Sequence, residues 1–225
     1  MVLSIVIPAY NEAAGLAATL LPLQAMRQRG VEIVLADGGS SDNTCEVARP
    51  WVDQIINAPK GRARQMNAGA AAARGDAFLF LHADSLLPAD GDEWIAIALA
   101  NGKTWGCFDI RISGRHFLLP VIAWFINRRS RLTGIATGDQ GIFATREAWH
   151  QCGGFPDQPL MEDVEFCKRM KKRSPPARLP AVLATSGRRW EQRGVWRTVW
   201  LMWRLRFQYF LGADPALLHA SYYGR

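Results

Sequence analysis

The chain has 225 residues, 49% hydrophobic residues and a formal net charge of +7, a size and composition that fit one globular domain with elaborations. No stretch reaches the ~18 uncharged apolar residues that a membrane span needs, and the first residues already predict a strand, so we expect neither a membrane span nor a signal peptide. Lys and Arg outnumber acidic residues by twelve to two over residues 165–207, which indicates an anionic partner or a solvated basic face.

The first half of the chain alternates predicted strands and helices. Residues 2–9, "VLSIVIPA", form a near-continuous apolar run, as is typical of a parallel strand buried on both faces. Leucines at helical spacing predict a helix over residues 12–28. Further strands are predicted at 31–37, 53–58 and 77–84, and further helices at 44–49 and 62–75. This repeated alternation predicts an α/β fold, with a mostly parallel sheet and helices on both of its faces.

The second half is less regular. Residues 105–113 and 140–145 predict strands, and residues 161–172 predict an amphipathic helix with its acids in the first turn. Residues 117–126 are strongly apolar, and residues 195–212 predict a long helix rich in tryptophan and arginine. We find no internal repeat and no linker.

The four cysteines are scattered and include no C-x-x-C pair. They are Cys45, Cys107, Cys152 and Cys167. We expect free thiols in a reducing cytoplasm, because a zinc site would need tighter clustering.

Polar residues follow three of the predicted strands. These ends read Tyr10-Asn11-Glu12, Asp37-Gly38-Gly39-Ser40 and His82-Ala83-Asp84. Ligands of parallel sheets bind outside the carboxyl ends of the strands, so three acid-bearing ends on one rim predict a binding site.

Two of these acids suggest particular chemistry. A single carboxylate such as Asp84, together with substrate phosphates, suits a hard cation such as Mg²⁺, although a helix cap or loop solvation is the alternative. The turn that holds Asp37 matches neither G-x-G-x-x-G nor a phosphate loop, and we expect Asp37 to accept hydrogen bonds from a base or ribose. Asp42, in the same turn, is better explained as a helix N-cap.

Further charged clusters leave two interpretations open. Lys60, Arg62 and Arg64 lie at a predicted helix N-terminus, where they either face a bound anion or form an exposed basic turn. Glu162 and Asp163 open another helix, where one carboxylate serves as a general base or both only favour the helix dipole.

The motifs "SIVIPAYNEA", "ADGGSSDNT", "FLHAD", "MEDVEF" and "RRW" stand in the order found in family 2 glycosyltransferases, which have the GT-A fold. The chain resembles this family from residue 3 to about residue 197. "GRARQMNAG", "TGIATGDQGIF" and "RRWEQRGVWRT" narrow the resemblance to small bacterial transferases named for their association with radical-SAM and selenoprotein-like domains.

The resemblance implies an inverting, metal-dependent transferase that uses a UDP- or GDP-linked sugar and Mg²⁺ or Mn²⁺. It also implies three regions: a nucleotide-sugar half (1–103), an acceptor half (104–194) and a helical extension (195–225) of one domain. The positions that would hold the nucleoside are Pro8, Tyr10, Glu12 and Asp37. Lys60 and Arg64 would add positive charge near the leaving group.

The same resemblance assigns the chemistry. Asp84 would bind the metal, and Asp163, with Glu162 beside it, would be the base. Arg189 and Trp190 would lie near the leaving group and the acceptor. His82 stands where many relatives have the first Asp of D-x-D, and we favour a ribose contact for it over a metal bond.

Other functions fit parts of the pattern. Processive polysaccharide synthases of this family carry the motif Q-x-x-R-W. Ser186 stands at the position of its Gln, so the resemblance does not imply processivity. A nucleotidyltransferase, or an inactive protein that binds nucleotides or nucleic acid, remains an alternative, although no nucleic-acid motif supports the latter.

The partners of the C-terminal helix remain open. The face that carries the tryptophans of residues 195–211 would contact the membrane, pack on the core or form a homodimer. In the first case residues 117–126 would help to receive a lipid-linked acceptor, and the protein would work in the cytoplasm at the inner face of the cell membrane.

Overall fold

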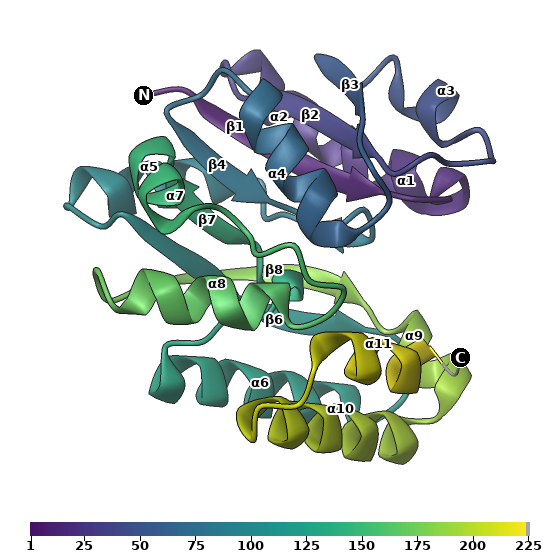
Figure 1. Cartoon of the computed structure of the whole chain (residues 1–225). Coiled ribbons are helices and arrows are strands. Elements are labelled where there is room, and N and C mark those ends of the chain that lie inside the picture. The colour runs from purple at the N-terminus through teal and green to yellow at the C-terminus, as the bar shows by residue number, and fades with distance from the viewer. Residues whose placement is uncertain (224–225) are drawn as a thin grey trace.

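The computed structural model describes residues 1–223, apart from the side chain of Arg189, and shows an α/β fold (Figure 1). Its strands are β1 (Leu3–Ala9), β2 (Glu32–Asp37), β3 (Gln54–Asn57), β4 (Ala77–Phe80), β5 (Ser85–Leu86), β6 (Trp105–Ser113), β7 (Ile142–Thr145) and β8 (Ala177–Ser186). Its helices are α1 (Ala13–Leu20), η1 (Leu21–Leu23), α2 (Gln24–Gln28), α3 (Thr44–Ala48), α4 (Arg62–Ala72), α5 (Gly91–Ala100), α6 (Leu119–Thr133), η2 (Gly138–Gln140), α7 (Arg146–Cys152), α8 (Glu162–Lys171), α9 (Arg188–Arg193), α10 (Val195–Phe210) and α11 (Pro215–Tyr223).

The eight strands form one sheet in the order β3-β2-β1-β4-β7-β6-β8-β5. Strands β1 to β4 are parallel, which confirms the predicted parallel first half. Strand β7 runs against both of its neighbours, β4 and β6. Its first residue, Ile142, therefore pairs with Phe80, the last residue of β4. The turn before β7 thus lies at the same rim as the carboxyl ends of β1, β2 and β4.

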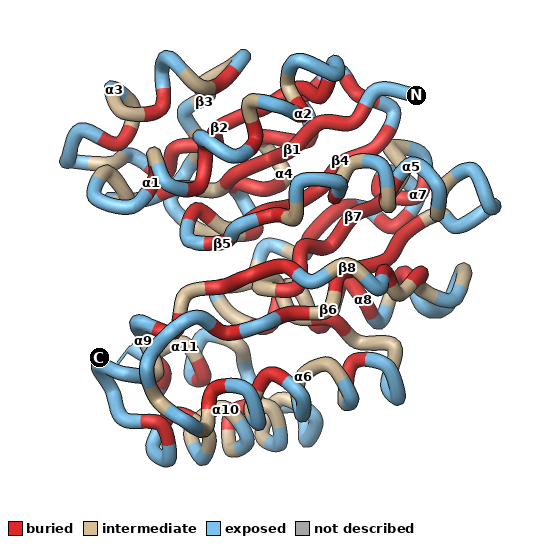
Figure 2. The backbone as a smooth tube through the Cα atoms, turned by 180° about the vertical axis from the view of Figure 1, so that it is seen from behind, coloured by how far each residue is buried: buried red, intermediate tan, exposed pale blue. Residues whose placement is uncertain are grey.

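Both faces of the sheet are buried, as the apolar strand sequences predict. Ile5 and Ile7 of β1 pack into one cluster with side chains of α1, α5 and α6, whereas Val6 points to the opposite face. That second cluster contains side chains of α4, α7 and α8. Because successive side chains of a strand point to opposite faces, each strand contributes to both cores. The buried central strands are visible in Figure 2.

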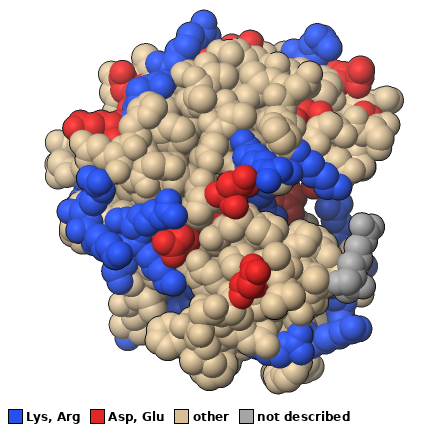
Figure 3. All heavy atoms as spheres, viewed as in Figure 1, with Lys and Arg blue, Asp and Glu red and all other residues tan. Residues whose placement is uncertain are grey.

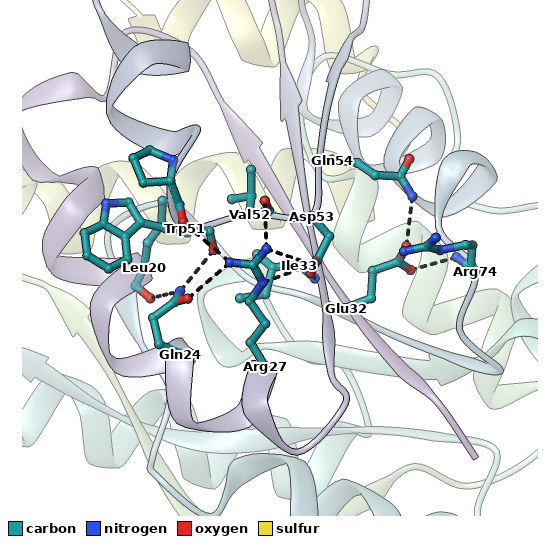
Figure 4. A network of polar contacts seen from close by, with 11 residues as sticks. Leu20, Gln24, Arg27, Glu32, Ile33, Trp51, Val52, Asp53, Gln54 and Arg74 are labelled. Atoms are coloured by element: carbon teal, nitrogen blue, oxygen red, sulfur yellow. Dashed lines mark hydrogen bonds and ion pairs between the residues drawn. The ribbon is translucent and has the colours of Figure 1, made fainter.

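A polar network fixes the edge of the sheet opposite the rim (Figure 4). The buried carboxylate of Glu32 accepts the Ser4 hydroxyl at 2.6 Å and the Arg74 Nε at 2.9 Å. Burial alone would raise the pKa of Glu32, but these hydrogen bonds outweigh it and lower the pKa. Arg27 similarly pairs with Asp53 at 2.9 Å. The strands that carry the rim are therefore held rigidly at their other ends.

Several elements differ from the prediction for local reasons. The helix expected over 12–28 is divided into α1, η1 and α2, and Pro22 lies in the 3₁₀ turn between them. The strand expected over 77–84 ends at Phe80. Strand β8 was not predicted; it contains Pro180 in a register shift, where Phe108 pairs with Leu179 and the next residue pairs with Val182. The predicted C-terminal helix is confirmed as α10.

All four cysteines are free thiols, and three of them are buried. None of the helices within residues 1–223 is both long and apolar enough to cross a membrane.

Candidate functional site

The candidate site lies at the carboxyl ends of the parallel strands. The arrowheads of β1 and β8 point to this side in Figure 1. Figure 3 shows Lys and Arg side chains along the boundary between the upper and lower parts of the molecule, next to a hollow at the right. The ends of β1, β2 and β4 thus meet on one rim, as the three polar strand ends predicted.

Asp37 ends β2 and organises the glycine-rich turn that follows it. Its Oδ2 accepts the backbone N–H groups of Gly39 and Ser40 at 3.0 and 2.9 Å, and its Oδ1 accepts the Ser40 hydroxyl. A carboxylate offers about four acceptor positions, so most of the capacity of Asp37 is used inside its own turn. The role of Asp37 is therefore partly structural, with little capacity left for a base or ribose.

The turn after β1 is bound to the same loop. Asn11 has a left-handed backbone (φ 54°), which asparagine tolerates, and its side chain accepts the Ser41 N–H at 2.8 Å. Glu12 donates its backbone N–H to the Thr44 hydroxyl at 2.9 Å. The prediction of Asp42 as the helix N-cap is wrong by one residue: Asn43 occupies the N-cap position of α3, and Asp42 before it accepts the N–H of Thr44. The two loops thus form one rigid unit.

The ends of β1 and β2 are also joined from below. Buried Gln65 of α4 donates its side-chain N–H groups to the carbonyls of Ala9 and Ala36, at 2.6 and 2.9 Å. Pro8 is half-buried and pairs in register with Ala36. Lys60 places its Nζ 3.8 Å from the centre of the exposed Tyr10 ring. Tyr10 and Lys60 therefore form an exposed aromatic and cationic pair beside the rim.

The structure fits a divalent cation at Asp84 but does not provide a protein cage for one. Within residues 1–223, no cluster of three or more His, Cys, Asp or Glu side chains could hold a metal. Asp84 is exposed, in the turn between β4 and β5. One accessible carboxylate suits Mg²⁺ or Mn²⁺ bound mainly through substrate phosphates.

His82, Gly138 and Asp163 meet at the centre of the rim. The Gly138 N–H donates to Asp163 Oδ2 at 2.7 Å. A Cβ at Gly138 would lie 2.6 Å from His82 Nε2 and 3.7 Å from Asp163 Oδ2, so only glycine fits between these side chains. The buried Nε2 of His82 thus faces Gly138.

The two acids at the start of α8 point in different directions. Glu162 is buried and lies 3.4 Å from the Arg62 guanidinium. Burial raises the pKa of Glu162, although Arg62 opposes the shift. Asp163 is half-buried at the rim. The preceding Met161 has a left-handed backbone (φ 64°), an uncommon conformation for a long side chain, and Glu162 and Asp163 diverge as consecutive residues of a helix do. The expected catalytic role therefore remains with Asp163, because Glu162 is turned into the protein.

The other predicted cations are spread around the rim. Arg64 is bound to Asp157 at 2.7 Å on the exposed surface, which raises the pKa of Arg64. Arg188 lies 3.8 Å from Glu12, so α9 reaches the end of β1. Trp190 is half-buried and packs against the core. The predicted role of Arg189 falls on a side chain outside the described residues.

Sequence reasoning missed the turn that holds Asp163. Thr137 and Gln140 form a capping box around η2, a pattern that T-x-x-Q in the sequence signals. Asp139 in that turn has a pKa raised by burial. Arg129 of α6 and Arg206 of α10 were also missed as a pair; they interact electrostatically with Asp139 and Asp163. No sequence pattern brings residues from these two helices together.

Comparison with known proteins gives the same assignment for most of the chain. The profile described as "Glycosyl transferase family 2" matches residues 4–153. An uncharacterized glycosyltransferase of Nostoc sp., alr2836, is 34% identical over 93 residues, which are 38% of this chain and 29% of that protein.

Solved structures share the fold. The structure of S. aureus TarS 1–349 with UDP has a TM-score of 0.65 and 18% identity, over 83% of this chain and 60% of that one. Mannosyltransferase PcManGT from Pyrobaculum calidifontis, with GDP-Man and Mn²⁺, has a TM-score of 0.66 and 20% identity, over 97% of this chain and 68% of that one. These matches confirm the expected fold. The narrower resemblance to radical-SAM-associated transferases remains a prediction.

Proposed function

The chain belongs to glycosyl transferase family 2, and on that basis we propose that it transfers a sugar from a nucleoside-diphosphate donor to an acceptor hydroxyl, with inversion. The observation that carries the proposal is the meeting of His82, Gly138 and Asp163 beside the exposed Asp84. The chain spans 29% of the length of its Nostoc relative and 60% of TarS, so its substrates are proposed from its own residues.

The donor half lies at the ends of β1 and β2. The ring of Tyr10 and the half-buried Pro8 offer apolar surface to a nucleoside, and Lys60 carries the positive charge. Asp84 would hold Mg²⁺ or Mn²⁺ through the donor diphosphate. The cation would neutralise charge on the departing diphosphate. Asp37 would contact the nucleoside only through the one hydrogen-bond acceptor position that its own turn does not use.

Asp163 acts as the general base. The Gly138 N–H fixes its Oδ2, so the carboxylate is oriented before the acceptor arrives. Asp163 takes the proton of the acceptor hydroxyl, the oxygen forms a bond to the anomeric carbon, and the bond from that carbon to the diphosphate breaks with its electron pair. Attack opposite the leaving group gives inversion. His82 packs against Gly138 and keeps this turn in place.

We also assign the acceptor side to an anionic membrane surface. The exposed face of α10 carries Trp196, Trp200, Trp203, Phe207 and Phe210, each more than 60% exposed. Helix α6 lies beside α10 in Figures 1 and 2 and exposes Val121, Trp124 and Phe125, and Phe117 just before the helix is also exposed. Neither helix contains an acidic residue, and both contain several arginines. Exposed tryptophans with neighbouring cations are suited to the headgroup region of an anionic leaflet.

Titration calorimetry with UDP and GDP, each with and without Mn²⁺, tests the donor site. We expect one nucleotide to bind in a Mn²⁺-dependent manner, and Asp84→Ala to lose the Mn²⁺ dependence. Asp90→Ala, which replaces an exposed acid next to the Ala89 carbonyl that Arg29 binds, away from the rim, is the control and should bind as the wild type does. Asp163→Asn should keep nucleotide affinity and lose turnover by at least about 10³-fold. Absence of binding to either nucleotide would contradict the proposal.

A further inference from the structure

A pocket lies next to the segment that carries Asp163. It has a volume of about 310 Å³ and lies between α6, α8 and α10. Its lining residues include Arg129, Met161, Val164, Arg206, Phe207 and Phe210. Met161 and Val164 flank Glu162 and Asp163 in the sequence, so the pocket borders the segment that carries the proposed base.

Two arginines bring positive charge to this pocket, next to the carboxyl groups of Asp139 and Asp163. Nε and Nη2 of Arg129 are buried and have no hydrogen-bond partner among the described residues. Burial, and to a smaller extent the neighbouring Arg206, lower the pKa of Arg129 to about 10. Burial also lowers the pKa of Arg206. Asp139 and Asp163 attract both guanidinium groups, but not enough to offset burial. Buried guanidinium nitrogens without hydrogen-bond acceptors are unfavourable unless a ligand supplies those acceptors.

Other arginines of the fold show how this chain normally satisfies such groups. Arg146 donates to the carbonyls of Gly75 and Ala73 at 2.8 and 2.7 Å. Arg178 donates to Cys107 Sγ and to the Ser130 carbonyl. Among the described residues, Arg129 has two such unsatisfied nitrogens, and Arg204, outside this pocket, has one.

The entrance to the pocket is apolar. Phe207 and Phe210 line it, and both belong to the exposed face of α10. A ligand in this pocket would place an anionic group against the arginines and an apolar part against the phenylalanines. A phosphate group matches the fork of donors that two guanidinium groups present.

We propose that Arg129 and Arg206 form a subsite for a phosphate group on the acceptor, next to the base Asp163. This inference rests on the proposed function and specifies its acceptor: a phosphate-bearing molecule whose hydroxyl reaches Asp163. A lipid-linked phosphate and a soluble phosphate ester share this chemistry. They differ in the apolar tail, which would contact the phenylalanines at the entrance and so raise the affinity of the lipid-linked form.

Binding of three probes tests the subsite without any turnover. The probes are farnesyl phosphate below its micellar concentration, farnesol and inorganic phosphate, titrated with Mn²⁺ and whichever of UDP and GDP binds the protein, so that the donor site is occupied. We expect Arg129→Gln and Arg206→Gln each to weaken binding of farnesyl phosphate at least tenfold. Arg128→Gln, an exposed arginine of the same helix, is the matched control and should stay within twofold of the wild type.

The outcomes separate this inference from the proposed function. Much tighter binding of farnesyl phosphate than of inorganic phosphate supports a lipid-linked acceptor. Equal binding of these two ligands supports a soluble acceptor, and either result supports the subsite. Equal binding of farnesol and farnesyl phosphate, or equal binding by wild type and both glutamine variants, overturns it. The affinity for the nucleotide should be unchanged in these variants. Failure of the wild type to bind a nucleotide would therefore contradict the proposed donor site and not the phosphate subsite. Thermal unfolding of each variant checks that it is folded.

Discussion

Replacing Arg129 with methionine should make the unliganded chain more stable. The pKa of this guanidinium falls to about 10 because of burial and the nearby Arg206. At ~1.4 kcal/mol for each tenfold change in the protonation equilibrium, the folded state disfavours the charged form by about 3 kcal/mol. Methionine keeps an unbranched, apolar chain in the same place and removes the charge. We therefore expect a gain of roughly 1–3 kcal/mol in the free energy of unfolding, in line with other replacements of buried charges.

The gain has a defined dependence on pH. A cation whose folded pKa lies below its unfolded pKa destabilises the fold fully at every pH below the folded value. As pH rises above about 10, the folded protein releases this proton while the unfolded chain still holds it, and the penalty fades. The difference between Arg129→Met and the wild type should therefore be constant from pH 7 to 9 and shrink above pH 10.

Urea unfolding followed by tryptophan fluorescence measures this effect. With a slope of ~2 kcal/mol per molar urea, a gain of 2 kcal/mol moves the midpoint up by about 1 M. Arg128→Met is the control: Arg128 is exposed on the same helix, and its replacement should change stability by no more than ~0.5 kcal/mol. If Arg129→Met were less stable than the wild type, the guanidinium would be satisfied in the folded chain, and our reasoning about the pocket would fail.

Three further predictions follow from single contacts. Gly138→Ala should lower kcat by ~10²-fold and leave nucleotide affinity within threefold. The new Cβ would lie 2.6 Å from His82 Nε2 and would displace the turn that orients Asp163. An unchanged kcat would show that catalysis does not need this turn. The double variant Trp200→Ser, Trp203→Ser should co-sediment with phosphatidylglycerol vesicles at least fivefold less than the wild type. Its urea midpoint should not change, because both rings are exposed. Equal co-sedimentation of the variant and the wild type would contradict the proposed membrane contact. Gly69→Ala should destabilise the fold by ~1–3 kcal/mol in the same urea assay, because its Cβ would lie 2.3 Å from Val6 Cγ1, and a neutral result would mean that α4 can move away from β1.

The donor half was largely predictable from the sequence because its information is local. Each of the first strands is a short apolar run bounded by turn residues, and a buried parallel strand needs no more than that. The polar residues that end these runs meet on one rim as a consequence of parallel pairing. What sequence alone did not give is the direction of each side chain. Asp37 turns into its own loop because the backbone N–H groups of that loop bind it, and Glu162 turns into the core toward Arg62, a residue 100 positions away in the sequence.

The acceptor half was less predictable because its contacts are distant in sequence. Strand β8 contains a proline and a register shift, so it lacks the alternation that identifies a strand. Strand β7 is inserted antiparallel, and this pairing brings Gly138 to the end of β4. Arg129 and Arg206 line the same pocket although they lie 77 positions apart in the sequence. Periodicity within one segment contains no information about such a pair.

The two halves of the rim differ in how their polar groups are satisfied, and this difference has a consequence for ligand binding. In the donor half, Asp37 and Gln65 already have partners within the fold, so a nucleotide meets a preformed surface. In the acceptor half, Arg129 has buried nitrogens without partners and the aromatic face of α10 is exposed. A ligand that binds only the folded state stabilises it in proportion to the affinity gained. Because the acceptor would relieve a penalty that the empty fold carries, saturation with farnesyl phosphate should raise the melting temperature of wild type more than that of Arg129→Met. The donor nucleotide should raise both equally.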